Sequence, residues 1–235
     1  MREIADFLFE VGMLKKTPRS GFQFLGSGCE SVAEHVLRTL YIGYVLCKMD
    51  PTADELTVLR LCLIHDLPEA RTGDMNYVNK KYVTVDEKKA VRELAAPLFF
   101  GGEIEAFLDE FNLKETKESL LAHDADQLSL ILQLKECGDL GNKYSREWIR
   151  FAVKRLTTEN ARELAKNILE TDSTNWWFKD KGDWWVNGNH GPAGECPGAL
   201  PFKPRLVGGD KGLNIKTDQF LTGKLRPRGR ELHID

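Results

Sequence analysis

The chain of 235 residues is long enough for one substantial hydrophobic core, with room for a second small domain. Its composition, 42% hydrophobic and 29% charged, is ordinary for a soluble globular protein, and its net charge of −3 argues against wholesale attraction to nucleic acid or to an anionic membrane. No apolar stretch is long enough to span a bilayer, and acids within the first ten residues argue against a signal peptide.

The N-terminal part is predicted to be helical almost throughout. Apolar residues at positions 4, 7, 8 and 11 recur at helical spacing, and T-P-R-S-G at 17–21 then interrupts the pattern. Ser31 and Glu34 form a capping box that begins a long helix. A further helix leads to His65, and helical patterns follow over about 86–99, 103–112, 115–137, 145–156 and 158–171. Strand signals are weak, so we predict an all-α fold over residues 1–172.

The composition changes near Thr171. The tail from that point holds ten of the twenty glycines, five of the nine prolines and four of the five tryptophans. Glycine and proline rule out a long helix, yet the tryptophans are too many for a merely solvated tail. We therefore expect residues 173–235 to form an irregular extension, rich in Gly, Pro and Trp, that packs on the helical domain or on the partner subunit of a homodimer.

The five cysteines are scattered and form no C-x-x-C pair. Cys47 and Cys62 lie in apolar helical patterns, where a reduced cysteine acts as a small hydrophobic residue. We expect no disulfides and a cytoplasmic location.

Histidines and acids interrupt several apolar segments. His65 and Asp66 adjoin near the end of one helix, His35 lies in the first turn of another, and Asp124 and Asp126 interrupt the apolar run LLAHDADQLSLILQL. A buried carboxylate without partners is very costly, so such acids imply hydrogen bonds, cations or a metal. Two imidazoles with two carboxylates would suit a divalent transition metal.

The spacing alone leaves a purely structural interpretation open. A single histidine in a helix is more often hydrogen-bonded than bound to a metal. The pair His65-Asp66 could also be an ordinary helix C-terminus, where the helix dipole favours a cation.

The order and separation of these residues resemble the H…HD…D pattern of the HD-domain metal-dependent phosphohydrolases. The resemblance is greater to the branch that contains the 5′-deoxynucleotidases and the HD domain-containing protein 2 group, and it covers about residues 1–178. The stretches that carry it are S-V-A-E-H at 31–35, H-D-x-x-E at 65–69, G-D at 73–74, A-D-Q-L at 125–128 and the segment 161–178. It implies an HD-domain helical bundle and one divalent metal ion, which could be Mn, Co, Ni, Fe, Zn or Mg.

Carried over position by position, the four metal ligands of the family fall on His35, His65, Asp66 and Asp126. Asp124 and Asp126 differ by about 200° around a helix, so they cannot both face one metal. The A-D-Q-L context favours Asp126. We expect Asp124 to support the site from behind or to lie on the surface.

The resemblance also assigns a glutamate and an aspartate that assist proton transfer and substrate positioning, and these fall on Glu69 and Asp74. Glu69 lies one helical turn after His65, but Pro68 predicts a kink or a helix end between them. The loop at 73–74 could then fold back over the metal.

Three residues are candidates for substrate binding. Arg19 matches an arginine that the branch uses for phosphate, and its planar fork could bind two oxygens at once. The branch often has a tryptophan near this arginine, whereas this chain has Phe22 and Phe24, so recognition of base or sugar departs from the pattern here. We take Phe22 as a binding residue. Lys81, beside Lys80, is a further candidate, although paired lysines are usually solvated.

The function implied is removal of the 5′-phosphate from (deoxy)nucleoside monophosphates, with no nucleic-acid or membrane partner. Two alternatives remain open. One is an HD-type hydrolase of alarmones or deoxynucleoside triphosphates; the glycine-tyrosine-proline signature of the cyclic-dinucleotide branch is not found. The other is a non-catalytic nucleotide-binding protein or helical scaffold.

Overall fold

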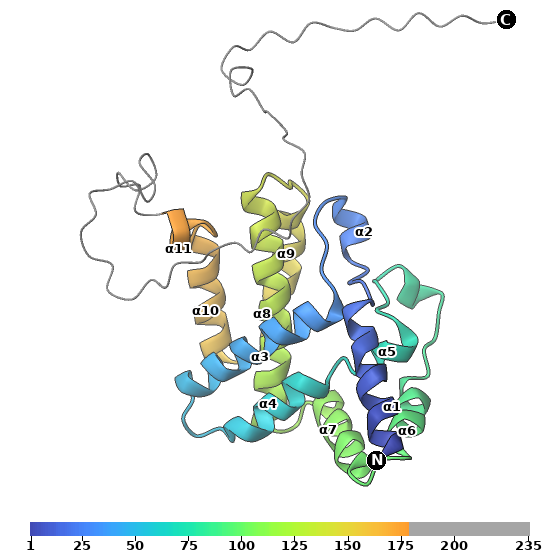
Figure 1. Ribbon diagram of the computed structural model, residues 1–235. Coiled ribbons are helices and arrows are strands. Elements are labelled where there is room, and N and C mark those ends of the chain that lie inside the picture. Colours follow the sequence, from blue (N-terminus) through green and yellow to red (C-terminus); the bar gives the residue numbers. More distant parts are fainter. Residues whose placement is uncertain (179–235) are drawn as a thin grey trace, which may run out of the picture. The chain divides into compact units, whose positions relative to one another are not determined.

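The computed structural model describes residues 1–178, and the remainder of the expected extension, 179–235, lies outside the described residues (Figure 1). Within residues 1–178 all regular elements are helical, and extended pairing is confined to an isolated bridge between Pro18 and Ser31. The all-α prediction is confirmed. The elements in chain order are α1 (Arg2–Val11), η1 (Gly12–Lys15), α2 (Phe22–Leu25), α3 (Val32–Met49), α4 (Glu55–Ile64), α5 (Glu69–Thr72), η2 (Asn79–Lys81), α6 (Glu87–Ala95), α7 (Gly101–Leu113), α8 (Lys117–Asp139), α9 (Ser145–Val153), α10 (Glu159–Glu170) and α11 (Asn175–Phe178).

Helix α8 lies at the centre of the described bundle. It contacts α3, α4, α7, α9 and α10, and Figure 1 shows α3 crossing it. A helix with neighbours on several sides must be apolar around most of its circumference. This one buries a series of side chains from almost every turn, namely Leu121, Ala122, Ala125, Leu128, Ile131 and Leu134.

Within residues 1–178, three apolar clusters hold the bundle together. The largest joins α3, α4, α8 and α10, and its members include Leu46, Leu61 and Leu128. A second joins α1, η1, α6 and α7 to the start of α3. A third packs Leu25 of α2 against α8 and α9. Because α3 and α8 each belong to two clusters, they carry the frame on which the other helices are placed.

The predicted capping box begins α3. The Ser31 hydroxyl accepts a hydrogen bond from the Glu34 backbone N–H at 3.2 Å, and the Glu34 carboxylate accepts one from the Ser31 N–H at 2.6 Å. Both bonds satisfy donors that a helix start leaves unpaired. They also fix His35 in the first turn of α3.

The prediction for Asp124 is wrong. Its side chain is fully buried and faces the start of α10, away from both the surface and the histidines. The carboxylate accepts hydrogen bonds from the backbone N–H groups of Thr157 and Thr158, both at 2.8 Å, and from their hydroxyls at 3.0 and 2.6 Å. An anion is favoured there because the first N–H groups of a helix lack partners within it.

Two further predictions can be compared with the structure. Helix α4 ends at Ile64 and α5 begins directly after Pro68, so the predicted break at the proline is confirmed. The segment after 172 was expected to be irregular, but residues Asn175–Phe178 form a short helix, α11. Trp176 borders a groove between α8 and α10, whereas Trp184 and Trp185 lie outside the described residues.

The described cysteines, Cys29, Cys47, Cys62 and Cys137, are free thiols, and Cys196 lies outside the described residues. None of the helices in the described part is both long and apolar enough to cross a lipid bilayer.

Candidate metal centre and active site

Three helices bring two histidines and two aspartates to one point. His35 comes from the first turn of α3, His65 and Asp66 follow the end of α4, and Asp126 lies in α8. Donor atoms of His35, His65 and Asp126 all lie within 4.8 Å of one another. Asp66 Oδ2 lies 3.3 Å from His65 Nε2 and 3.6 Å from His35 Nε2. The four residues that the resemblance selected therefore form a single cluster.

The Nδ1 atoms of both imidazoles are engaged behind the cluster. His65 Nδ1 lies 2.8 Å from the Cys62 carbonyl oxygen, which can only accept, so Nδ1 carries the proton. His35 Nδ1 lies 3.0 Å from the Ser129 hydroxyl. When Nδ1 carries the only proton of each ring, which the Ser129 hydroxyl allows for His35, each Nε2 has a lone pair that can bind a metal.

The two Nε2 atoms are buried and find no hydrogen-bond partner among the described residues. His35 Nε2 lies 3.1 Å from Asp126 Oδ1, but outside hydrogen-bonding geometry. Nitrogen lone pairs and carboxylate oxygens this close repel one another unless a proton or a metal cation lies between them. This donor set, two imidazoles and two carboxylates, fits a divalent transition metal.

The charges at the cluster favour a cation strongly. Burial acts to raise the pKa of Asp66, but the charges of His65, His35 and Arg19 lower it to about 2. Burial acts to lower the pKa of His65, but Asp66 and Asp126 raise it to about 9. For Asp126, burial is likewise outweighed by the contact with His35, so its pKa lies well below the usual range. The carboxylates thus stay ionised and attract positive charge to the imidazoles.

Gln127 holds Asp126 in position. Its Nε2 donates to Asp126 Oδ2 at 2.9 Å, and its Oε1 accepts from Arg155 Nη1 at 3.1 Å. The amide is therefore fixed at both ends, and the carboxylate is left with Oδ1 facing the histidines.

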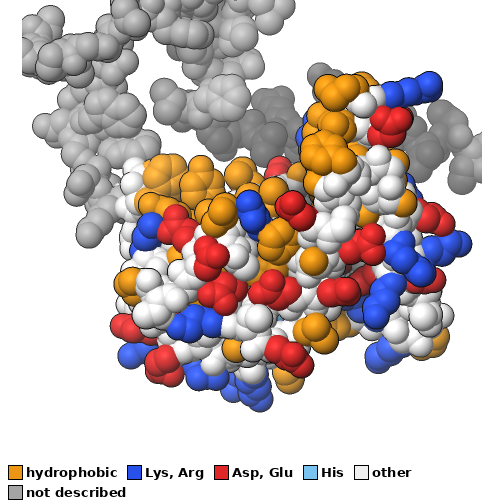
Figure 2. All heavy atoms as spheres, turned by 90° about the horizontal axis from the view of Figure 1, so that it is seen from below, with side chains coloured by type: hydrophobic (Ala, Val, Ile, Leu, Met, Phe, Trp, Pro, Cys, Tyr) orange, Lys and Arg blue, Asp and Glu red, His pale blue; other side chains and the backbone are white. Residues whose placement is uncertain are grey.

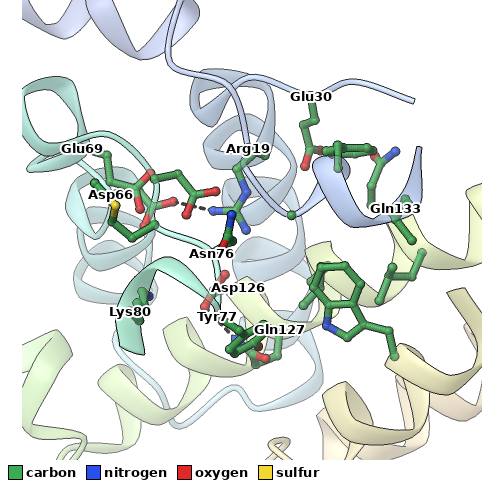
Figure 3. Close-up of a pocket in the computed structure, with 18 of the residues that line it drawn as sticks. Arg19, Glu30, Asp66, Glu69, Asn76, Tyr77, Lys80, Asp126, Gln127 and Gln133 are labelled. Atoms are coloured by element: carbon green, nitrogen blue, oxygen red, sulfur yellow. Dashed lines mark hydrogen bonds and ion pairs between the residues drawn. The ribbon is translucent and has the colours of Figure 1, made fainter. Parts of the chain in front are cut away.

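Arg19 lies beside the cluster because its segment pairs with the residues that precede α3. The Arg19 N–H donates to the Glu30 carbonyl at 2.8 Å, and the Val32 N–H donates to the Thr17 carbonyl at 2.9 Å. The guanidinium Nη1 lies 3.3 Å from Asp66 Oδ2 (Figure 3). Burial acts to lower the pKa of Arg19, but the neighbouring carboxylates raise it above its ordinary value, so the side chain stays charged.

The loop after α5 folds back onto this arginine segment. Asp74 Oδ2 accepts from the Ser20 N–H at 2.7 Å and from the Ser20 hydroxyl at 3.3 Å. Glu69 starts α5, and its buried Oε2 finds no hydrogen-bond partner in residues 1–178. Burial raises the pKa of Glu69 to about 9, and the charges of Asp66 and Asp74 act in the same direction.

A cavity of about 200 Å³ opens beside the cluster. Its charged lining residues include Arg19, Asp66, Glu69, Asp74 and Asp126, and Figure 3 shows Arg19 between Asp66 on one side and Glu30 with Gln133 on the other. A second set of lining side chains is mostly apolar or aromatic, namely Phe22, Leu25, Tyr77, Leu130, Leu134 and Trp148.

The two lysines considered for substrate binding differ in their position relative to the cavity. Lys80 borders the cavity, whereas Lys81 is exposed and does not line it. Both lie in η2, and successive residues of a 3₁₀ helix point in different directions.

The sequence model of the HD domain family matches residues 11–168. The chain belongs to the HD domain family. It is similar to the 5′-deoxynucleotidase HDDC2 of Danio rerio, with 27% identity over 194 residues that cover 74% of this chain and 96% of the relative. The 5′-deoxynucleotidase HDDC2 of Dictyostelium discoideum is 30% identical over 148 residues, with 58% and 78% covered. A solved structure, a conserved hypothetical protein from Pyrococcus furiosus, superposes with a TM-score of 0.63 at 28% identity and covers 71% of this chain and 99% of its own.

Several cavity residues of this HD domain were not selected from the sequence. They are Glu30, Met75, Asn76, Tyr77, Gln127, Gln133, Trp148 and Arg155. Gln127 directly follows Asp126 in the sequence, and this adjacency is a signal by which it could have been selected. Trp148 and Arg155 reach the cavity only because α9 packs on α8, and no local pattern marks them.

Proposed function

We propose that this HD domain protein is a metal-dependent phosphomonoesterase that removes the 5′-phosphate from deoxynucleoside monophosphates. The observation that carries the proposal is the pair of Nε2 atoms of His35 and His65, which have no hydrogen-bond partner among residues 1–178 and lie close to Asp66 and Asp126. Both aspartates line a cavity together with Arg19. The relatives described as 5′-deoxynucleotidase support the substrate class.

His35, His65, Asp66 and Asp126 would hold one divalent cation. The cluster mixes nitrogen and oxygen donors, which favours Mn, Fe, Co, Ni or Zn over Mg, because Mg²⁺ prefers oxygen ligands alone. When bound, such a cation supplies positive charge to phosphate oxygens and lowers the pKa of a water molecule.

Arg19 would bind the phosphate. Its Nη1 contacts Asp66 at 3.3 Å, which aims the guanidinium at the cavity while other N–H groups of the fork can donate to phosphate oxygens. Charge develops on those oxygens as the ester bond breaks, and a fixed cation stabilises that charge without reorganising. Lys80 is better placed than Lys81 to add a second positive group, because it borders the cavity.

Glu69 would transfer a proton to the leaving 5′-oxygen. Its carboxyl group lines the cavity, and its buried Oε2 lacks a partner in the described part of the chain. A carboxyl group that keeps its proton in such surroundings can donate it to an alkoxide as that group departs. A water molecule forms a new bond to phosphorus as the bond to the 5′-oxygen breaks, and the 5′-oxygen takes the Glu69 proton and leaves as a hydroxyl. The proton that the water loses restores the Glu69 carboxyl group.

Asp74 and Phe22 would contact the nucleoside. Ser20 occupies Asp74 Oδ2, which holds the carboxylate at the cavity wall with Oδ1 available for a sugar hydroxyl. Phe22 is half-buried and lies on the apolar part of the wall.

The alternative HD substrates differ in size and charge. The products distinguish these three activities, because a monophosphatase releases phosphate, a triphosphohydrolase releases triphosphate, and an alarmone hydrolase releases pyrophosphate.

The test is a substrate panel. Protein loaded separately with Mn, Co, Ni, Fe, Zn and Mg is incubated with every deoxy- and ribonucleoside monophosphate, and released phosphate is measured. We expect release from deoxynucleotides with at least one transition metal and none from Asp126→Asn. Nucleotide binding without product under every metal would contradict the proposal and favour a non-catalytic nucleotide-binding protein.

We further propose a cytoplasmic homodimer without nucleic-acid or membrane partners. The free thiols of the described cysteines are compatible with a reducing compartment. Figure 2 shows acidic and basic side chains interspersed on one face, a distribution that does not favour a polyanion. Light scattering on the full chain tests the dimer, and a monomer at micromolar concentration would contradict it.

A further inference from the structure

We propose that Trp148 forms a nucleobase subsite on the aromatic part of the cavity wall. The inference rests on the proposed nucleotide substrate and adds to it the group that recognises the base. Of the aromatic residues that follow Arg19 in sequence, Phe22 lines the cavity and Phe24 does not. Trp148 reaches the same wall from α9, far away in sequence.

Trp148 lies directly against the turn that carries Arg19. A Cβ atom built on Gly21 would lie 2.7 Å from Cη2 of the indole, so only glycine allows this approach without a shift. The indole and the guanidinium therefore border one cavity from adjoining positions. A nucleotide with its phosphate on Arg19 would extend its nucleoside along the apolar wall toward Trp148.

The indole offers both a surface and a donor to a base. Its Nε1 is buried and has no hydrogen-bond partner among residues 1–178. An indole N–H can only donate, and a buried Trp in a purely structural role normally finds an acceptor. Ring nitrogens and carbonyl oxygens at the edge of a base are such acceptors. The leucine side chains that line the same wall, Leu25, Leu130 and Leu134, suit the apolar faces of a base.

Continuous contacts join this wall to Asp126 in the cluster of histidines and aspartates. The Tyr77 ring lies edge-on to Trp148 with centroids 6.1 Å apart, and the Arg155 guanidinium lies 5.0 Å from the Tyr77 centroid. Arg155 in turn donates to Gln127, which donates to Asp126. The wall is thus held in place before a substrate arrives, which lowers the cost of ordering it on binding.

The decisive experiment compares substrates with and without a base. Wild-type, Trp148→Phe and Trp148→Ala proteins, loaded with the metal that gives most activity, are assayed on a deoxynucleoside monophosphate and on 2-deoxyribose 5-phosphate. Loss of base stacking predicts a fall in kcat/KM of roughly 5- to 100-fold for Trp148→Ala on the nucleotide. Trp148→Phe keeps a ring without the donor, so about a fivefold fall is expected. The sugar phosphate should change by less than about twofold.

Two controls accompany these variants. Trp176→Phe makes the same chemical change at a tryptophan that is 87% exposed and outside the cavity, and both substrates should be unaffected. Gly21→Ala should displace the indole and reproduce the selective loss on the nucleotide, whereas Gly12→Ala, with open space around its Cβ, should not. Equal losses on the two substrates would overturn the subsite, because Trp148 would then only support the arginine turn.

Binding gives a readout that does not depend on turnover. The contribution of Trp148 to the fluorescence is the difference between the emission of the wild type and that of Trp148→Phe. A deoxynucleoside monophosphate should quench this contribution, and 2-deoxyribose 5-phosphate should not. Absence of this difference overturns the subsite. A wild-type protein that shows the difference but releases phosphate from neither substrate supports the subsite and contradicts only the proposed hydrolysis.

Discussion

The orientation of the two imidazoles depends on a few atoms behind them. The His65 ring is fixed by a backbone carbonyl, whereas the His35 ring depends on one hydroxyl, that of Ser129. Groups that fix the far nitrogen of a metal-binding histidine usually matter nearly as much as the ligand.

Ser129→Ala should therefore weaken metal binding by about 10- to 100-fold while the helices stay intact. Titration calorimetry with the activating metal measures this, and circular dichroism checks the fold. Ser119→Ala is the matched control, because Ser119 is equally buried in α8 but bonds to the Thr116 carbonyl at the other end of the helix. Unchanged affinity in Ser129→Ala would show that His35 needs no support from this hydroxyl.

Glu69→Gln tests proton donation. The substitution keeps the shape of the side chain and removes its acidic proton, so kcat on deoxynucleotides should fall by about 10²- to 10⁴-fold. A phenolic leaving group departs without a proton, so p-nitrophenyl phosphate should be hydrolysed with a much smaller loss. Similar losses on both substrates would assign Glu69 to another step, such as activation of water.

Individual residues also show which parts of the candidate site could be predicted from the sequence. His35, His65, Asp66 and Asp126 were selected because their order along the chain resembles the HD pattern, and the structure places them in one cluster. Trp148 and Arg155 were not found, because their position at the cavity is set by the packing of α9, which no motif records.

At the scale of elements, periodicity and capping signals predicted the helices well. The capping box at Ser31 and the break at Pro68 were placed correctly because each follows from local chemistry. The pairing of Arg19 with Glu30 was missed, since two backbone hydrogen bonds between distant loops leave no trace in side-chain patterns.

Substitution of Asp124 tests how the start of α10 is stabilised. Asp124→Asn replaces an acceptor of four hydrogen bonds by an amide whose NH₂ group faces donors. The free energy of unfolding should therefore fall by about 3 kcal/mol. Urea denaturation measures the change. Asp109→Asn, an exposed residue on α7, should have little effect, and metal affinity should survive in both variants. A stability equal to that of the wild type would contradict the role assigned to the start of α10.

At the scale of the whole molecule, a bound cation would link α3, the end of α4 and α8. A ligand that binds only the folded state stabilises it by about 2.7 kcal/mol at 100 times its Kd. For a domain of this size that corresponds to a rise in Tm of roughly 5 to 10 °C. Thermal unfolding with and without metal should show this rise in the wild type and in Asp109→Asn, and a chelator should reverse it. Asp126→Asn should show none, and an equal rise there would place the metal elsewhere.

The proposed metal ligands come from segments far apart in the chain, and the long loop between α5 and α6 lies between Asp66 and Asp126. Tyr82 in this loop is 83% exposed, which makes it a natural place for protease cleavage. A single cut there would divide the ligands between two fragments, with His35, His65 and Asp66 on one and Asp126 on the other. The cation would then hold the two fragments together. The cleaved enzyme should therefore stay associated while the metal is bound and dissociate more readily once a chelator has removed it.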